Sequence, residues 1–197
     1  MNTSEIYSAL AHLMAHRKGH FNVIPCDYLD HLRPQFPLYL VVNDEPNGWP
    51  GQHWVALYIK KPASRMEFFC SYGLGIDNYP HHFKKFAQRL KCRVIENHTR
   101  LQSSNSNVCG QFCIYFLYMK MRGCSCKFSN NRNKNDQVVK KFVKSLHFIQ
   151  FFNKKHEQCC IFNYILTMVF SLLAYLEDVL VASPQTVGDP RVSFVLC

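Results

Sequence analysis

Residues 102–113 read QSSNSNVCGQFC, a polar segment that changes into an apolar one at Cys109. The polar half predicts a loop. If the segment from Cys109 to Met121 forms a helix, nearly every face of that helix is apolar, which predicts a central helix covered by other elements. The Cys109 thiol would then lie at the start of a helix, where unpaired backbone N–H groups and the helix dipole stabilise negative charge.

A His-Trp pair lies upstream, at His53 and Trp54, and begins an apolar run that predicts a buried strand. A histidine on a separate strand can take the proton of the Cys109 thiol, and the Gln102 amide can donate to a developing oxyanion. Cys109 alone would more often be a buried structural thiol. The upstream glutamine and the following Gly110 favour a catalytic thiol, so the residues predict a cysteine peptidase.

The remaining hydrophobic pattern alternates between helices and short strands. It predicts helices at 4–16 (capped by Ser4), 79–90 and 136–146, strands at 38–42, 53–59, 66–71 and 92–96, and an irregular segment at 19–37. The predicted class is therefore α+β, with a small mixed or antiparallel sheet packed against the helix that begins at Cys109.

Pairing of the two central strands predicts which residue faces His53. If their turn is centred on Lys61 and Pro62, Ala56 faces Glu67 and His53 faces Cys70. A carboxylate is expected at that place, where it would hold the imidazole in its working tautomer. A thiol is a weak hydrogen-bond partner. Asp77, beyond the following turn, is a second candidate for this role.

Five stretches of the chain, in order, resemble the adenovirus maturation protease and, more closely, the related proteases of Maverick/Polinton-type virus-like transposons. Both groups belong to the clan of the SUMO-specific proteases. The matching stretches are Phe21 to Leu29, Leu40 to Tyr58, Phe68 to Gly73, Gln102 to Leu117 and Asn135 to Val143. The resemblance covers about residues 20–146 and implies a papain-like cysteine peptidase fold.

The resemblance also implies roles for single residues: His53 as general base, Cys109 as nucleophile and Gln102 as oxyanion-hole donor, without a cofactor. The family usually has Asp or Glu in the third catalytic place, which Cys70 fills here. The implied function is a cysteine-type endopeptidase of reduced activity that processes viral or transposon structural proteins. A SUMO-like substrate is a second enzymatic option. The alternative is a catalytically inactive protease fold that binds a ubiquitin-like protein or DNA.

Charge and cysteine content suggest partners and a compartment. The net charge is +10, and residues 147–197 contribute none of the excess. Residues 120–144 hold eight basic residues against Asp136, which suggests DNA binding as strongly as it suggests a solvated surface. Ten irregularly spaced cysteines without a secretory signal predict a reducing, intracellular location, in the nucleus or in a virion-like particle. His81-His82 and the Cys124/Cys126 pair lack metal-site spacing, so no metal is predicted.

The C-terminal part differs in character, so residues 1–146 are predicted to form the peptidase-like domain and 147–197 a hydrophobic tail. Residues 158–176 are 19 positions without a charge, fifteen of them apolar. That is close to the length that crosses a bilayer, but the segment is marginal and contains polar residues. A core helix or a poorly folded appendage is the favoured interpretation over a membrane span.

Overall fold

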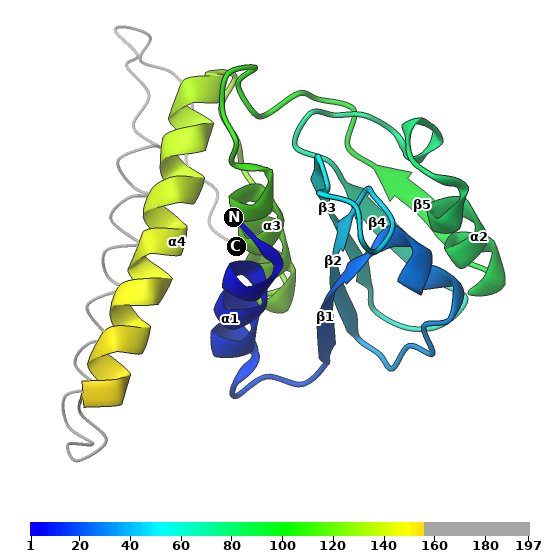
Figure 1. Ribbon diagram of the computed structural model, residues 1–197, viewed down its shortest axis with the longest axis horizontal. Coiled ribbons are helices and arrows are strands. Elements are labelled where there is room, and N and C mark those ends of the chain that lie inside the picture. The colour runs from blue at the N-terminus through cyan, green and yellow to red at the C-terminus, as the bar shows by residue number, and fades with distance from the viewer. Residues whose placement is uncertain (156–197) are drawn as a thin grey trace, which may run out of the picture. The chain divides into compact units, whose positions relative to one another are not determined.

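Five strands form one mixed sheet in the computed structural model, which describes residues 1–155, with side-chain surroundings through residue 146 (Figure 1). The strands are β1 (His20–Pro25), β2 (Leu38–Asn43), β3 (Trp54–Ile59), β4 (Arg65–Phe69) and β5 (Arg93–Glu96). Their spatial order follows the chain, from β1 to β5. The three central strands are antiparallel, and the outer strands β1 and β5 each run parallel to their neighbour.

Each face of the sheet carries its own hydrophobic cluster, because side chains alternate along a strand. In β2, Leu40 and Val42 belong to one cluster, whereas Tyr39 and Val41 belong to the other. Almost the whole of β2 is buried, which is why its sequence is a continuous apolar run.

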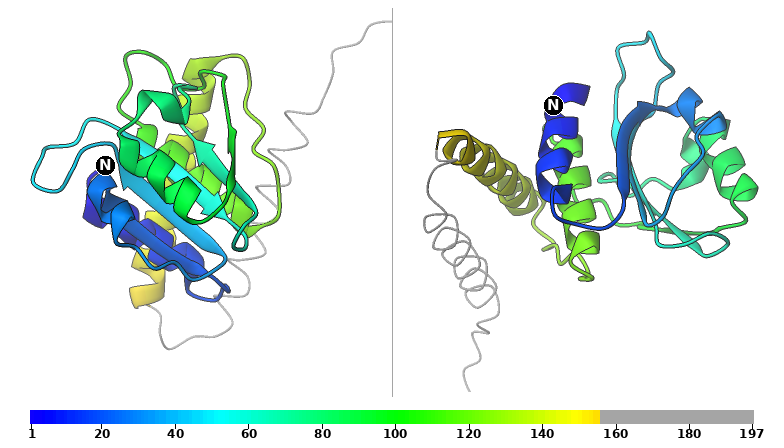
Figure 2. Two further views of the ribbon diagram at one scale, coloured as in Figure 1. Left: turned by 90° about the vertical axis from the view of Figure 1, so that its right-hand side faces the viewer. Right: turned by 90° about the horizontal axis from the view of Figure 1, so that it is seen from below.

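One face is covered by α1 (Thr3–Met14) and α3 (Cys109–Met121), as Figures 1 and 2 show. α1 begins with a capping box, in which Asn2 and Glu5 each accept a hydrogen bond from the other's backbone N–H. Its buried residues Ile6 and Leu10 lie one turn apart and contact the same cluster as α3. α3 is buried on most sides, which agrees with its nearly uniform apolar sequence.

The opposite face is covered by α2 (His81–Arg89) and the short 3-10 helix η1 (Cys26–Asp30). Phe83 and Phe86 of α2 are fully or almost fully buried. A second 3-10 turn, η2 (Ile76–Asn78), leads from β4 into α2. β3 and β4 are antiparallel, so the end of β4 and the start of β3, which follows His53, lie at the same end of the sheet. The segment between β4 and α2 begins at this end.

α4 runs from Arg132 to Lys155, and Val139, Val143 and Leu146 pack into the cluster around α3. The predicted division of the chain at residues 146 and 147 stays a prediction. The segment 158–176 lies outside the described residues. Within residues 1–155, no helix combines the length and the apolar content needed to cross a bilayer.

The predicted α+β class is confirmed: a small mixed sheet packs against the helix that begins at Cys109. Three local predictions are wrong. Residues 20–25 are a strand, because His20–Pro25 pairs along its whole length with β2. The cap of α1 is Asn2 and not Ser4. The last helix begins at Arg132, four residues before the predicted start, because the Asn131 side chain accepts a hydrogen bond from Lys134 N–H.

Candidate active site

Cys109 is the first residue of α3, and its half-buried thiol lies against the start of β3. Burial, the larger influence, raises the pKa of the Cys109 thiol. The backbone N–H groups of Trp54 and Gly110, which reach the sulfur, lower this pKa but only partly offset the effect of burial. The thiol therefore keeps its proton at neutral pH, while the N–H groups that would stabilise a thiolate are already in place.

His53 immediately precedes β3, and its ring is buried. Its backbone is held by two hydrogen bonds with Asp44: His53 N–H donates to Oδ1 at 2.8 Å, and Asp44 N–H donates to the His53 carbonyl at 3.0 Å. The imidazole stacks on the Tyr72 ring, with the ring centroids 4.9 Å apart. The Nε2 atom lies 3.5 Å from Cys70 Sγ.

Trp54 joins these two residues into one cluster. Its backbone N–H reaches the Cys109 sulfur, and its carbonyl accepts a hydrogen bond from Cys113 Sγ at 3.3 Å. Tyr72, which stacks on His53, is also close to Cys109: burial raises the pKa of the Tyr72 hydroxyl, and the charge of a Cys109 thiolate adds to that rise. His53 and Cys109, which come from two elements far apart in the sequence, thus have Trp54 and Tyr72 as shared neighbours.

Cys70 is fully buried at the end of β4, behind the imidazole. Its sulfur accepts a hydrogen bond from the Tyr79 hydroxyl at 3.0 Å and another from Tyr72 N–H at 3.3 Å. A carboxylate at this place would only accept from His53 Nε2, which would fix the tautomer that leaves Nδ1 free as a base. A thiol both donates and accepts, so Cys70 leaves both tautomers of His53 open.

The contact between His53 and Cys70 arises differently from the predicted pairing. Ala56 pairs with Phe69 and not with Glu67, so the predicted register of the hairpin is wrong by two residues. The loop that connects β3 to β4 is longer than the tight turn predicted at Lys61 and Pro62, because Ile59 pairs with Met66. A shift of two residues keeps every side chain on the same face, and both His53 and Cys70 lie just beyond the paired residues. Their side chains can therefore meet although they are not directly opposed.

Gln102 is buried on the loop before α3, and its amide is anchored at both ends. Oε1 accepts from the Ser71 hydroxyl at 2.7 Å. Nε2 donates to the Ser106 carbonyl at 2.5 Å and to the Tyr72 hydroxyl at 3.3 Å. Through Tyr72 the amide is thus linked to the ring that packs on His53.

Comparisons with known proteins find a similar viral protein and a similar solved structure. No protein-family model matches the chain. A protein named "Protease" from Bovine adenovirus 7 is 29% identical over 106 residues, which are 48% of this chain and 50% of the relative. The chain resembles an adenovirus protease. It spans about half the length of this curated relative.

Among solved structures, ChlaDub1 from Chlamydia trachomatis is similar to this chain, with 16% sequence identity and a TM-score of 0.44. The alignment covers 73% of this chain and 75% of the ChlaDub1 chain. The predicted resemblance to adenovirus protease is confirmed by the sequence match, which supports a peptidase at the level of the family. The roles of single residues stay predictions.

Three residues of the candidate active site were not identified from the sequence. Tyr72 lies within a stretch that carries the resemblance, yet nothing in its spacing indicated a ring stacked on His53. Tyr79 and Asp44 lie in loops, whose course the hydrophobic pattern does not predict. Asp77, the second candidate for the missing acid, has an exposed carboxylate that forms an ion pair with Lys84 at 2.7 Å, and its substitution for the acid stays a prediction.

The buried imidazole predicts a pH-dependent stability. Burial lowers the pKa of His53 from 6.5 to about 4, and the Asp44 carboxylate acts in the opposite direction. In the unfolded chain His53 therefore binds a proton below about pH 6.5, whereas in the folded chain it binds one only below about pH 4. Stability from the neutral ring is complete above pH 6.5 and is lost as the pH falls toward 4. We expect the free energy of unfolding to fall by about 2 kcal/mol between pH 7.5 and 5 because of His53.

Urea denaturation of the wild type and of His53→Gln, each at both pH values, measures this effect. Other groups that titrate in this range contribute equally to both proteins, so only the difference between the two slopes reports on His53. Equal slopes would show that the imidazole is not held in a desolvated place.

Proposed function

We propose that the chain is a cysteine-type endopeptidase with Cys109 as nucleophile and His53 as general base. The observation that carries the proposal is the position of Trp54 between the two proposed catalytic residues. Its backbone N–H reaches the Cys109 sulfur, and the residue before it supplies a buried imidazole. A nucleophile at a helix start with a base beside it is the arrangement that thiol catalysis requires. The similarity to the Bovine adenovirus 7 protease supports it.

The reaction begins from a neutral pair. Because the pKa of Cys109 is raised and the pKa of His53 is lowered, the proton remains on the sulfur in the free protein. His53 takes this proton as Cys109 Sγ attacks the substrate carbonyl carbon, and then gives it to the leaving amine. The resulting thioester is hydrolysed by water, which returns the thiol. Such a pair reacts more slowly than a preformed thiolate–imidazolium pair, and this is a second reason to expect reduced activity.

Gln102 is proposed as the side-chain donor to the oxyanion, together with backbone N–H groups at the start of α3. One of its N–H groups is committed to the Ser106 carbonyl, whereas the other makes only the longer bond to the Tyr72 hydroxyl. The second N–H is the one available to a substrate oxygen once Tyr72 moves. The Ser71 hydroxyl keeps the amide in the orientation that this role needs.

The proposed substrate is a structural precursor protein of a virus or virus-like element, on the strength of the adenovirus relative. A SUMO-like protein is the second option. A DNA partner, a membrane partner and a location in the nucleus or a virion-like particle stay predictions. Lys120, one of the eight basic residues of 120–144, is already paired with Glu67 at 2.6 Å.

An inactive binding module is the rival proposal, and Cys70 is the observation that favours it. Without a carboxylate behind His53, neither tautomer is enforced, and the Asp44 carboxylate, which favours the imidazolium, does not offset the effect of burial. Both proposals share the same fold and the same candidate active-site residues. They differ only in whether Cys109 reacts.

Labelling with a peptide vinyl sulfone, followed by mass spectrometry of the digested protein, tests the proposal. We expect the adduct on Cys109, because the Trp54 and Gly110 N–H groups reach its sulfur and His53 is proposed as its base. Cys124 is exposed and serves as the internal control for non-specific alkylation. Labelling of Cys124 without Cys109 would favour the binding module.

A further inference from the structure

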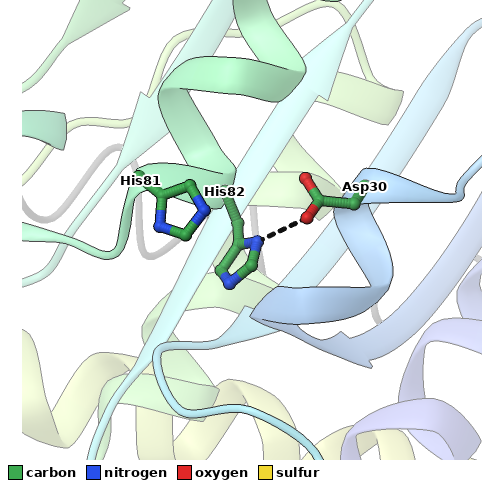
Figure 3. A group of neighbouring side chains, drawn as sticks. All are labelled: Asp30, His81 and His82. Atoms are coloured by element: carbon green, nitrogen blue, oxygen red, sulfur yellow. Dashed lines mark hydrogen bonds and ion pairs between the residues drawn. The ribbon is translucent and has the colours of Figure 1, made fainter.

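Asp30, His81 and His82 form a cluster on the side of the sheet that α2 covers (Figure 3). One nitrogen or oxygen atom from each of the three lies within 4.8 Å of the others. His82 Nδ1 is 2.8 Å from Asp30 Oδ2, and the two imidazole centroids are 4.1 Å apart. The two histidines come from the first turn of α2, and the carboxylate comes from the last residue of η1.

The spacing of His81 and His82 predicts no metal site, because adjacent helical residues normally point in different directions and Asp30 is remote in the sequence. Folding creates it by packing η1 against α2. Arg89, at the other end of α2, donates to the carbonyls of Leu29, Asp30 and Leu32 at 2.7, 2.6 and 2.9 Å. The guanidinium thereby fixes the end of η1, and with it the backbone that carries the Asp30 carboxylate.

The cluster has unused capacity to bind a ligand. Asp30 Oδ1 is buried and accepts no hydrogen bond, which is costly for a carboxylate oxygen. Lys85 Nζ lies 3.6 Å from this atom, an ion-pair distance longer than a hydrogen bond. His81 is exposed, so a ligand can reach the cluster from solvent.

We infer that Asp30, His81 and His82 together form a binding site for a divalent transition metal ion of the zinc type. Two imidazoles and a carboxylate are the donor set that zinc accepts. Tetrahedral zinc bonds of about 2.0–2.1 Å place ligand atoms about 3.3 Å apart, so the wider contacts must close while the 2.8 Å contact opens slightly. Side-chain rotation supplies both changes. The exposed side of His81 leaves the fourth position to water.

Two charges oppose the cation. The start of α2 is the positive end of the helix dipole, and the Lys85 ammonium already faces Asp30. Metal binding must displace this ammonium into solvent. That competition gives the site a distinctive signature: removing the Lys85 charge strengthens metal binding, although it weakens the ion pairing that a purely structural cluster would depend on.

The site adjoins the segment that supports Cys70. Tyr79, which donates to Cys70 Sγ, lies two residues before His81. A metal bound at the start of α2 therefore fastens the chain next to Tyr79. The bound metal would stabilise the fold. The inference does not depend on whether Cys109 is catalytic.

Titration of the full-length, metal-free chain with Zn²⁺ and with Co²⁺, in a buffer with a non-thiol reductant, tests the site. Calorimetry should give one zinc ion per chain, with an increase in Tm that a chelator reverses. The cobalt complex should show d–d absorption without the intense sulfur-to-cobalt charge-transfer band of a thiolate site. His81→Ala and His82→Ala should each weaken binding by at least about 10²-fold, and Lys85→Met should tighten it several-fold.

His98→Ala is the matched control, because His98 is exposed and remote from η1 in sequence; it should bind like the wild type. Cys109→Ala should also bind normally, which separates this site from the thiol and imidazole of the candidate active site. A charge-transfer band, binding that survives both histidine substitutions, or no binding of Zn²⁺ at micromolar concentration would each overturn the inference.

Discussion

Cys109→Ala is expected to lower kcat for peptide hydrolysis by at least about 10³-fold. Removal of the nucleophile from a complete serine triad costs about 10⁶-fold, and we expect the wild type to start from a lower rate because Cys70 is proposed to take the place of the acid. The substitution takes away one half-buried sulfur and leaves the Trp54 and Gly110 N–H groups in place. A mass-spectrometric assay of a peptide library before and after incubation measures the loss.

Cys113→Ser is the matched control for this experiment. Cys113 lies one turn further along α3, is fully buried, and donates to the Trp54 carbonyl at 3.3 Å. A serine hydroxyl can make the same hydrogen bond, so the fold and the hydrolysis should persist. Equal turnover by the wild type and Cys109→Ala would remove the proposed nucleophile. No turnover by any of the three proteins would favour the binding module.

Cys70→Asp is expected to raise kcat/KM by about 10²-fold. Loss of the orienting acid costs a serine peptidase about 10⁴-fold, and cysteine depends on it less because a thiol is intrinsically more nucleophilic. An aspartate at this place can accept from the Tyr79 hydroxyl, from Tyr72 N–H and from His53 Nε2. It would fix one tautomer and raise the pKa of His53 from about 4 toward neutrality.

The same gain should appear in the pH profile. The acid limb of kcat/KM should lie near pH 4 in the wild type, because the base works only when neutral, and should move upward in Cys70→Asp. Cys70→Asn places a neutral group of similar size in the cavity and should give a smaller gain with a smaller shift. If Cys70→Asp remains folded, as judged by Tm, and neither its rate nor its acid limb changes, then Cys70 does not occupy the acid position.

Much of the fold follows from local pattern. The continuous apolar runs of β2 and β3 predict strands buried on both faces, and the uniformly apolar Cys109–Met121 predicts a covered helix. β1 was missed because prolines and glycine surround it, and only its pairing with β2 makes it a strand. Pairing is a property of two segments, so a pattern within one segment cannot reveal it.

The candidate site divides in the same way. His53, Cys109 and Gln102 carry signals in their immediate neighbours, so the amino-acid sequence alone is enough to name them. Tyr72 and Tyr79 have no such signal, because their contacts depend on how the loops after β4 pass behind the imidazole. The cluster of Asp30, His81 and His82 likewise exists only because η1 packs on α2.

The linear chain by itself determined which residue types are available and which segments are apolar enough to be covered: a thiol at a helix start, an imidazole before a strand, and a thiol where an acid is usual. Tertiary packing decided how far the pKa values of His53 and Cys109 depart from their ordinary values. Water is excluded from His53 and Cys109 by elements distant in sequence, and this desolvation holds both of them neutral. Burial and contact geometry arise from chain segments meeting in space, and the reactivity of the pair depends on them.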